Sequence, residues 1–454
     1  MRSTAFQYLL SAAVAVSARE PIFGSNLGIC GASSLDSSSW NPVCTRNSES
    51  AGIDLEIHLP SNTHRAANKP DQVRLSASNK IPDDWKWSRT PECLREQNMT
   101  EKFCLFTSHE FAHNRGISLW TTPEHSEELL KLPAFTNPDL LRGVNEEPNP
   151  PYESRQLPGR GMGLIANRTL QKGDHIFSMT PVVMIEEKIF DIFAKSDRLP
   201  YLRTMVKRLP ERSEKRLMDL CGHFGGDPAE DIINTNAFAI DMWEDDDDEE
   251  TAYNVVFPEI SRLNHDCRPN AHYYFDPETL VQNVHAIRTI LPGEELTISY
   301  IDPAQIRSER QHQLHQSWGF QCSCSLCTQP KAHTDASDAR IEHIASLREE
   351  LEDYSPESEA TTSMAELLVS LYEQERLYGP IAEAHALAAI EFNGVGEPST
   401  AQKYARLAVE TGLLYGGPAD KDVKEMEKLL KDPWAHWSWM LRTNKRMEVA
   451  GTPS

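Results

Sequence analysis

Three closely spaced cysteines carry the clearest chemistry of the chain. Cys322, Cys324 and Cys327 place three thiols within six residues. Closely spaced thiolates bind zinc, and a structural zinc site takes four ligands in a tetrahedron, so a fourth ligand must come from another part of the chain. A disulfide or inert buried thiols are the alternatives, but a C-x-C-x-x-C cluster with no further cysteine nearby in the sequence fits a metal better. We therefore predict a structural zinc site.

Three further segments hold residues that could position a reaction. They are Gly159-Arg160-Gly161-Met162-Gly163-Leu164, Asn264-His265-Asp266-Cys267-Arg268-Pro269-Asn270 and Gly293-Glu294-Glu295-Leu296-Thr297-Ile298-Ser299-Tyr300. In this order and at these distances, together with the cysteine cluster, they resemble the SET domain, the fold of protein-lysine methyltransferases. Their combination is far more specific than any one short motif.

The resemblance implies a ligand set and a cofactor. In SET proteins the cysteine of the Asn-His-x-Cys-x-Pro-Asn motif completes a post-SET zinc site, which implies the ligands Cys267, Cys322, Cys324 and Cys327. The resemblance also implies S-adenosylmethionine as methyl donor, with the glycines allowing close approach of the backbone. The residues implied to bind the donor are Arg160, Gly161, Met162, Gly163, Asn236, Asn264, His265, Tyr300 and Phe320, the last by stacking on the adenine.

The implied reaction is methyl transfer to a lysine side chain. A free lysine has a pKa of about 10.4, so its deprotonation at pH 7 costs about 4.6 kcal/mol. A narrow apolar channel lowers this cost because it disfavours the ammonium form. By resemblance, Tyr300 is the catalytic residue that aligns amine and methyl group, and Phe238 and Trp318 line the channel. Core packing is the alternative for Phe238 and Trp318.

A narrower resemblance is to the SMYD and fungal SET5-like branch. It rests on the Asn-x-Asn-x-Phe segment at 234–238, on the residues of the 264–270 motif and on a helical C-terminal region. That branch often carries a MYND zinc finger, which needs several cysteine and histidine ligands. The only cysteine and histidine between residues 185 and 235 are Cys221 and His223, so we expect that the chain lacks the finger. Two other classes stay open: a non-catalytic SET-like module that recruits partners, and a secreted or luminal SET-fold protein.

The elements that must position these residues follow from the pattern of apolar side chains. From 158 to 328, short strand-like runs alternate with turns, and residues 186–235 have helical spacing. An acidic run at 244–250 is typical of a solvated loop, with docking of basic peptides as the alternative.

After Pro330 the periodicity becomes helical. Apolar positions predict helices around 364–372, 384–390, 401–414 and 423–430, with pairs of tetratricopeptide (TPR) type. We expect Trp434, Trp437 and Trp439 to pack in the core. The predicted fold class is therefore α+β: a SET-type fold of short sheets with a helical insert and a post-SET zinc site, followed by a helical TPR-like domain.

Composition limits the partners. The chain has 454 residues with a formal charge of −23, which disfavours direct binding of nucleic acid over a broad surface. A protein substrate with an accessible lysine, basic or histone-like, suits this charge, although acidity also serves solubility alone. No stretch is long and apolar enough to span a membrane. We expect a monomer.

The N-terminal region and the inferred activity predict different cellular compartments for the protein. Residues 1–18 have the pattern of a signal peptide, and Cys30, Cys44, Cys93 and Cys104 follow in an even number, as disulfides in an oxidising compartment would require. The inferred activity instead indicates the nucleus or cytoplasm, so both remain open. The expected organisation is a leader at 1–18, an irregular region at 19–150, a SET plus post-SET domain at 151–330 and a helical domain at 331–454.

Overall fold

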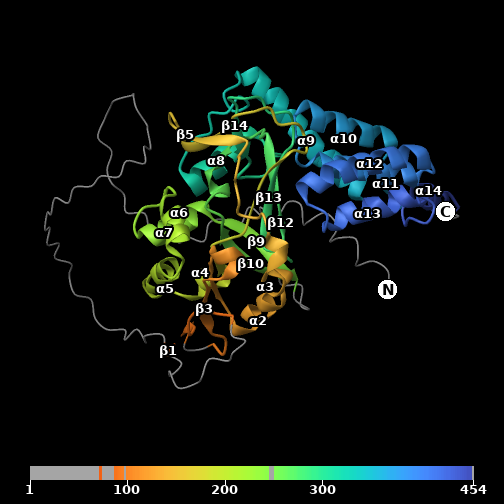
Figure 1. Cartoon of the computed structure of the whole chain (residues 1–454). Helices are drawn as coiled ribbons and strands as arrows, with labels where there is room; N and C mark the ends of the chain where they lie inside the picture. The colour runs from red at the N-terminus through yellow and green to blue at the C-terminus, as the bar shows by residue number, and fades with distance from the viewer. Residues whose placement is uncertain (1–70, 74–85, 97–98, 245–249, 452–454) are drawn as a thin grey trace, which may run out of the picture.

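A computed structural model describes residues 71–73, 86–96, 99–244 and 250–451 (Figure 1). Strands gather in the centre, one group of helices lies beside them, and the C-terminal helices form a separate group against one end of the strands. The leader predicted at 1–18, Cys30, Cys44 and the middle of the acidic run lie outside the described residues. Among the described residues, no helix has the length and apolar character needed to cross a membrane.

The largest sheet joins strands of the N-terminal region to strands between residues 183 and 256. Its seven strands lie in the order β1-β2-β3-β4-β8-β10-β9, and β4 pairs with β8 in parallel. The strands are β1 (Asp71–Val73), β2 (Glu92–Arg95), β3 (Phe103–Ser108), β4 (Ile117–Thr121), β8 (Val183–Glu186), β10 (Glu250–Val256) and β9 (Phe238–Glu244).

The described part of 19–150 is therefore not the irregular region that we expected. Strand β3 is buried on both faces: Phe103 and Leu105 enter one apolar core, and Cys104 and Phe106 enter another. A strand buried on both sides shows no polar alternation, which hides it from pattern analysis. Cys104 is disulfide-bonded to Cys93 on the neighbouring strand.

Short helical segments complete the N-terminal region. They are α1 (Phe111–Asn114), α2 (Pro123–Lys131), α3 (Pro133–Thr136) and the 3-10 helix η1 (Pro138–Leu141). Helix α2 begins after Thr122, whose side chain accepts a hydrogen bond from the His125 backbone N–H and so caps the helix.

Two smaller sheets carry most of the predicted site. One has the order β11-β14-β6-β5, with β11 (Asn264–His265) parallel to β14 (Glu295–Ile298) and β6 (Gly161–Ala166) antiparallel to β5 (Tyr152–Leu157). The other has the order β12 (Ala271–Asp276), β13 (Val281–Ala286) and β7 (His175–Met179). The first sheet brings all three sequence motifs side by side.

The helical insert is present at the predicted place. It consists of α4 (Lys188–Ile192), α5 (Lys195–Lys207), α6 (Glu211–Met218) and α7 (Pro228–Asn236). Its apolar residues pack against the face of the large sheet that carries Trp120 and Val183. Helix α7 ends directly before β9, so Asn236 is the last residue of the helix and Phe238 is the first residue of the strand.

The C-terminal region is helical, as predicted. After η2 (Ile260–Arg262) and α8 (Arg307–Trp318), the chain forms α9 (Lys331–Glu352), α10 (Thr362–Gln374), α11 (Ile381–Gly394), α12 (Pro398–Tyr415), α13 (Lys421–Lys431) and α14 (Leu441–Gly451). Helices α9 to α13 share one apolar core, and Tyr415 stacks on His272 of β12 at 4.1 Å between ring centres. The combination of sheets and helices confirms the α+β class, while the TPR-like character stays a prediction.

The prediction for the tryptophans is wrong in part. Trp434 is 61% exposed and Trp437 is 38% exposed. The side chain of Asp432 accepts the backbone N–H of Trp434 and so fixes a turn, and His436 and Ser438 are the buried residues of this segment. The turn therefore directs the polar side chains inward and leaves these two indoles at the surface.

Candidate functional site

The four predicted zinc ligands lie together. The sulfur atoms of Cys267, Cys322, Cys324 and Cys327 all lie within 4.8 Å of one another, and all four residues are buried and free of disulfides. The Cys267 sulfur is 3.9 Å from that of Cys322 and 3.5 Å from that of Cys327. Zinc–sulfur bonds of about 2.3 Å in a tetrahedron require sulfur–sulfur separations of about 3.8 Å. The site therefore fits a four-thiolate zinc ion.

Local backbone geometry shapes this cluster. Helix α8 ends at Gly319, whose φ of 67° reverses the chain ahead of the cysteines. The backbone N–H of Cys324 then points at the sulfur of Cys322, and that of Cys327 points at the sulfur of Cys324, at 3.5 and 3.4 Å. These N–H groups favour the ionised thiolates that zinc requires.

Arg310 is a residue of the site that the sequence did not reveal. Four thiolates around Zn²⁺ leave a net negative charge, and the buried side chain of Arg310 faces Cys267 and Cys327. Burial opposes the charge on its guanidinium, but the two thiolates outweigh burial and raise the pKa of Arg310. Its charge can therefore offset that of the cluster.

His265 links the zinc cluster to Tyr300. Its Nδ1 atom accepts the backbone N–H of Tyr300 at 3.0 Å, so the ring proton sits on Nε2, 3.3 Å from the Cys267 sulfur. Burial lowers the pKa of His265 to about 3, so the ring is neutral at pH 7. Both ring nitrogens are occupied. This leaves the main chain of His265, and not its imidazole, for the predicted contact with a methyl donor.

The first and second motifs are joined by Glu295. Its carboxylate accepts a hydrogen bond from the Asn264 amide at 2.7 Å and pairs with Arg160 at 2.9 Å. The Asn264 amide also reaches the Met162 carbonyl at 3.3 Å, and Arg160 donates to the His265 carbonyl at 3.0 Å. Glu295 was not predicted as a site residue, because its partners come from distant parts of the chain.

The two glycines of the first motif differ in their surroundings. Gly161 has a φ of +72°, and nothing lies within 4 Å of the position that a Cβ would take. At Gly163 a Cβ would stand 2.5 Å from Leu157, 2.8 Å from Glu295 and 3.0 Å from Asn264. Gly161 thus exposes its backbone to open space, and Gly163 permits the contact between the two motifs.

A cavity opens beside Tyr300. Four predicted site residues line it, from four separate segments: Asn236, Phe238, Tyr300 and Trp318. The Tyr300 hydroxyl donates to the Leu263 carbonyl at 2.7 Å, and the Tyr300 and Trp318 rings lie 5.2 Å apart. The structure therefore brings the predicted tyrosine and the predicted channel residues to one cavity.

Four of the residues that line this cavity are aromatic, and two of the predicted site residues, Asn236 and Phe320, differ from the others in their contacts. Tyr273, which was not predicted, packs edge-on against Phe238 at 5.1 Å. The amide of Asn236 donates to the carbonyls of Cys221 and Ile232, so its N–H groups are engaged by the backbone at and near the end of α7. Phe320 does not line this cavity. It packs beside the zinc cluster, 6.2 Å from the His265 ring.

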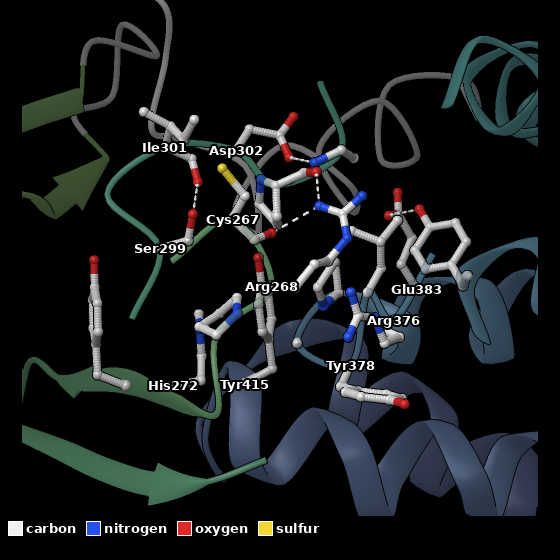
Figure 2. A pocket seen from close by; sticks show the side chains of 18 of the residues that line it. Cys267, Arg268, His272, Ser299, Ile301, Asp302, Arg376, Tyr378, Glu383 and Tyr415 are labelled. Atoms are coloured by element: carbon white, nitrogen blue, oxygen red, sulfur yellow. Dashed lines mark hydrogen bonds between the residues drawn. The ribbon is translucent and has the colours of Figure 1, made fainter. Parts of the chain in front are cut away.

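A second cavity lies between residues 267–273 and 299–304 on one side and the C-terminal helices on the other (Figure 2). It shares Tyr273 and Ser299 with the first cavity, so the two adjoin. Tyr415 and Tyr378 contribute aromatic walls, and Glu383 contributes a carboxylate held by Tyr372 and Arg348. No sequence motif indicated this cavity, because its two sides come from regions far apart in the chain.

Comparison with known proteins supports the assignment of these motifs. Residues 161–301 match the SET domain family. The chain is 27% identical over 307 residues to histone-lysine N-methyltransferase set5 of Schizosaccharomyces pombe, a match that covers 63% of this chain and 87% of the relative. It is 30% identical over 146 residues to human N-lysine methyltransferase SMYD2, covering 32% of this chain and 30% of SMYD2.

A shorter match is more similar. Human histone-lysine N-methyltransferase SMYD3 is 43% identical over 77 residues, which cover 17% of this chain and 18% of SMYD3. The chain thus spans less than a third of each SMYD relative named here but most of the yeast relative. With the motifs gathered on one sheet and the four cysteines together, residues 161–301 of this chain form a SET domain, and the chain is similar to proteins of the SET5/SMYD type.

Proposed function

We propose that the protein transfers a methyl group from S-adenosylmethionine to the side-chain amine of a lysine in a protein substrate. The observation that carries the proposal is the cavity in which Tyr300 meets the aromatic rings of Phe238, Tyr273 and Trp318. The SET match and the relatives, which are named lysine methyltransferases, support the same reaction.

The residues around the first motif fit the methyl donor. Gly161 leaves open space beside its backbone, so main-chain groups of 160–163 can approach an amino-acid moiety closely. Asn264 and the main chain of His265 lie on β11, from which the Asn264 amide donates to the Met162 carbonyl of the first motif, and Phe320 would supply a face for the adenine. When bound, S-adenosylmethionine supplies an electrophilic methyl group on a sulfonium.

The cavity residues would prepare the acceptor amine. The aromatic walls offer little hydration to an ammonium group, so they favour the neutral amine that can act as nucleophile. Burial raises the pKa of Tyr300, which keeps its hydroxyl protonated at pH 7. Because that hydroxyl donates to Leu263, its oxygen retains lone pairs that can accept from the amine and orient it.

The substrate that we propose is a basic protein segment. The relatives set5 and SMYD3 are named histone-lysine methyltransferases, and the formal charge of −23 of this chain would attract a Lys- and Arg-rich partner. The second cavity adjoins the first at Tyr273 and Ser299. Residues that flank the acceptor lysine would therefore lie along the C-terminal helices.

The test is an assay of the purified full chain with isotopically labelled methyl donor and a panel of basic proteins that includes core histones. We expect label on lysine, located by mass spectrometry, and about 100-fold slower labelling with a Tyr300→Phe variant that binds the donor normally by calorimetry. If no panel protein is labelled and calorimetry detects no donor binding, the proposal fails.

A further inference from the structure

Arg268 follows the zinc ligand Cys267 directly, yet its side chain does not face the metal site. It points toward the C-terminal helices, and Figure 2 shows its guanidinium beside the backbone of Cys267. Arg268 pairs with Glu375 at 2.9 Å, and both side chains are 2% exposed. An arginine buried to this degree needs a partner for each of its donors.

All parts of the guanidinium are engaged, and they contact three segments. The Nε and Nη2 atoms donate to the backbone carbonyl and the carboxylate of Glu375, at the C-terminal end of α10. The Nη1 atom donates to the carbonyl of Cys267 at 2.7 Å and to that of Pro303 at 2.8 Å. One side chain therefore fastens the loop of a zinc ligand, the loop that follows Tyr300 and the helical region.

Glu375 is held equally firmly on its other side. Its carboxylate accepts from the Ser337 hydroxyl and from Arg340, each at 2.7 Å, and both residues lie on α9. The network thus extends from the motif at 264–270 into the core of the C-terminal helices. A buried ion pair contributes little net stability. Stability alone therefore does not explain why the hydrogen-bond network around Arg268 and Glu375 reaches so far.

We propose that Arg268 and Glu375 are positioning residues, through which the C-terminal helices fix the zinc-ligand loop and the loop after Tyr300. This inference rests on the proposed function for its effect on turnover, but its effect on zinc retention is independent of that function. The route to the reacting centre is short, because Cys267 contacts His265 and His265 holds the backbone of Tyr300. Partners of this kind, one step removed from a metal, typically change affinity or activity by about 10- to 100-fold.

A matched control exists within the helices. Arg442 on α14 pairs with Glu391 on α11 at 2.7 Å, with side-chain exposures of 4% and 1%. This pair is as buried as the first, but within the part of the chain that the structure describes its hydrogen bonds lie among the C-terminal residues 351–442 and reach neither cavity nor the cysteines. Glu375→Gln and Glu391→Gln are therefore comparable changes at two distances from the site.

The experiment measures zinc release to a chelator, thermal unfolding, and kcat and KM, in the full zinc-loaded chain. We expect Glu375→Gln to speed zinc release and to lower kcat, each about tenfold, with a smaller change in KM. Glu391→Gln should lower the unfolding temperature without either effect. Arg268→Lys, which keeps the charge but loses the fork of donors, should behave like Glu375→Gln.

Two results would overturn the inference. One is equal zinc release and equal kcat in the Glu375 and Glu391 variants, which would show that the network only stabilises the fold. The other is normal behaviour of Arg268→Lys, which would show that the geometry of the fork is not used. If the wild type transfers no methyl group, the proposed function fails, and the zinc-release comparison alone still decides the inference.

Discussion

The imidazole of His265 stands between Tyr300 and Cys267, holding the backbone N–H of the first at 3.0 Å and the sulfur of the second at 3.3 Å. The residue proposed to orient the substrate and a residue proposed to hold zinc are thus neighbours through one neutral ring. Damage to the metal site should therefore reach the Tyr300 cavity, even though zinc has no proposed part in the reaction.

Replacing Tyr300 by phenylalanine should remove catalysis with little change in structure. The hydroxyl makes one hydrogen bond, to the Leu263 carbonyl, and its oxygen is the proposed acceptor for the amine. Misalignment of reactants can cost on the order of 100-fold, so we expect kcat to fall by about that factor while donor affinity changes little. Single-turnover kinetics and calorimetry measure the two quantities. A variant with normal turnover would favour a non-catalytic SET-like module.

Replacing Cys324 by serine should abolish stoichiometric zinc and destabilise the protein. The four sulfurs form one closed set within 4.8 Å, and loss of one thiolate leaves an incomplete tetrahedron. Structural zinc contributes several kcal/mol, on the order of 10 in zinc-finger peptides. Elemental analysis and thermal unfolding provide the readouts, with Ser323→Ala, at an exposed neighbour, as control. One zinc per chain in the serine variant would contradict the site.

Gly163→Ala should weaken the contact between the first two motifs. The added methyl group would lie 2.5 Å from Leu157 and 2.8 Å from the Glu295 carboxylate, and overpacking of this kind costs about 1–3 kcal/mol. We expect a lower unfolding temperature and weaker donor binding. A second substitution, Leu157→Ala, removes the nearest obstacle and should restore part of the stability. Failure of this rescue would place the strain elsewhere.

The protein should lose stability in mild acid. Burial lowers the pKa of His272 to about 3, with His285 as a second cause, and lowers the pKa of His285 to about 4, with His175 as a second cause. Unfolded histidines titrate near pH 6.5, so below that pH the unfolded chain binds more protons than the folded one. Stability therefore falls as the pH drops from about 6.5 to 4.

Thermal unfolding across this pH range checks the expectation. His272→Phe keeps the stacking on Tyr415 but removes one buried base, so the fall should become shallower. His312→Gln, at an exposed position on α8, is the control and should leave the slope unchanged. An unchanged slope in His272→Phe would exclude His272 as a source.

The sequence predicted those features that depend on residue type and local spacing. The three cysteines, the SET motifs and the C-terminal helices can be predicted because each is recognised by the spacing of particular residues along the chain. Even Cys267 was placed by its motif. By contrast, Glu295 and Arg310 belong to the site because of contacts with residues that are distant in the sequence. No local sequence pattern could identify them.

The N-terminal strands show a different limit. Phe103 to Ser108 is buried along its whole length because both faces of the sheet are covered. Flanking serines, asparagines and prolines made the region look irregular, while the burial that defines β3 depends on helices and strands that come later in the chain. Trp434 is the reverse case, a large apolar residue that a turn leaves outside.

The parallel pairing of β4 with β8 has a practical consequence for crystallisation. A shortened fragment that began at Pro151 would retain the SET motifs but strip the partner from β8, whose Val183, Met184 and Ile185 are fully buried. An uncovered apolar edge of this kind recruits other chains and precipitates. Truncations meant for structural work should therefore start ahead of Trp87, which packs under the same sheet.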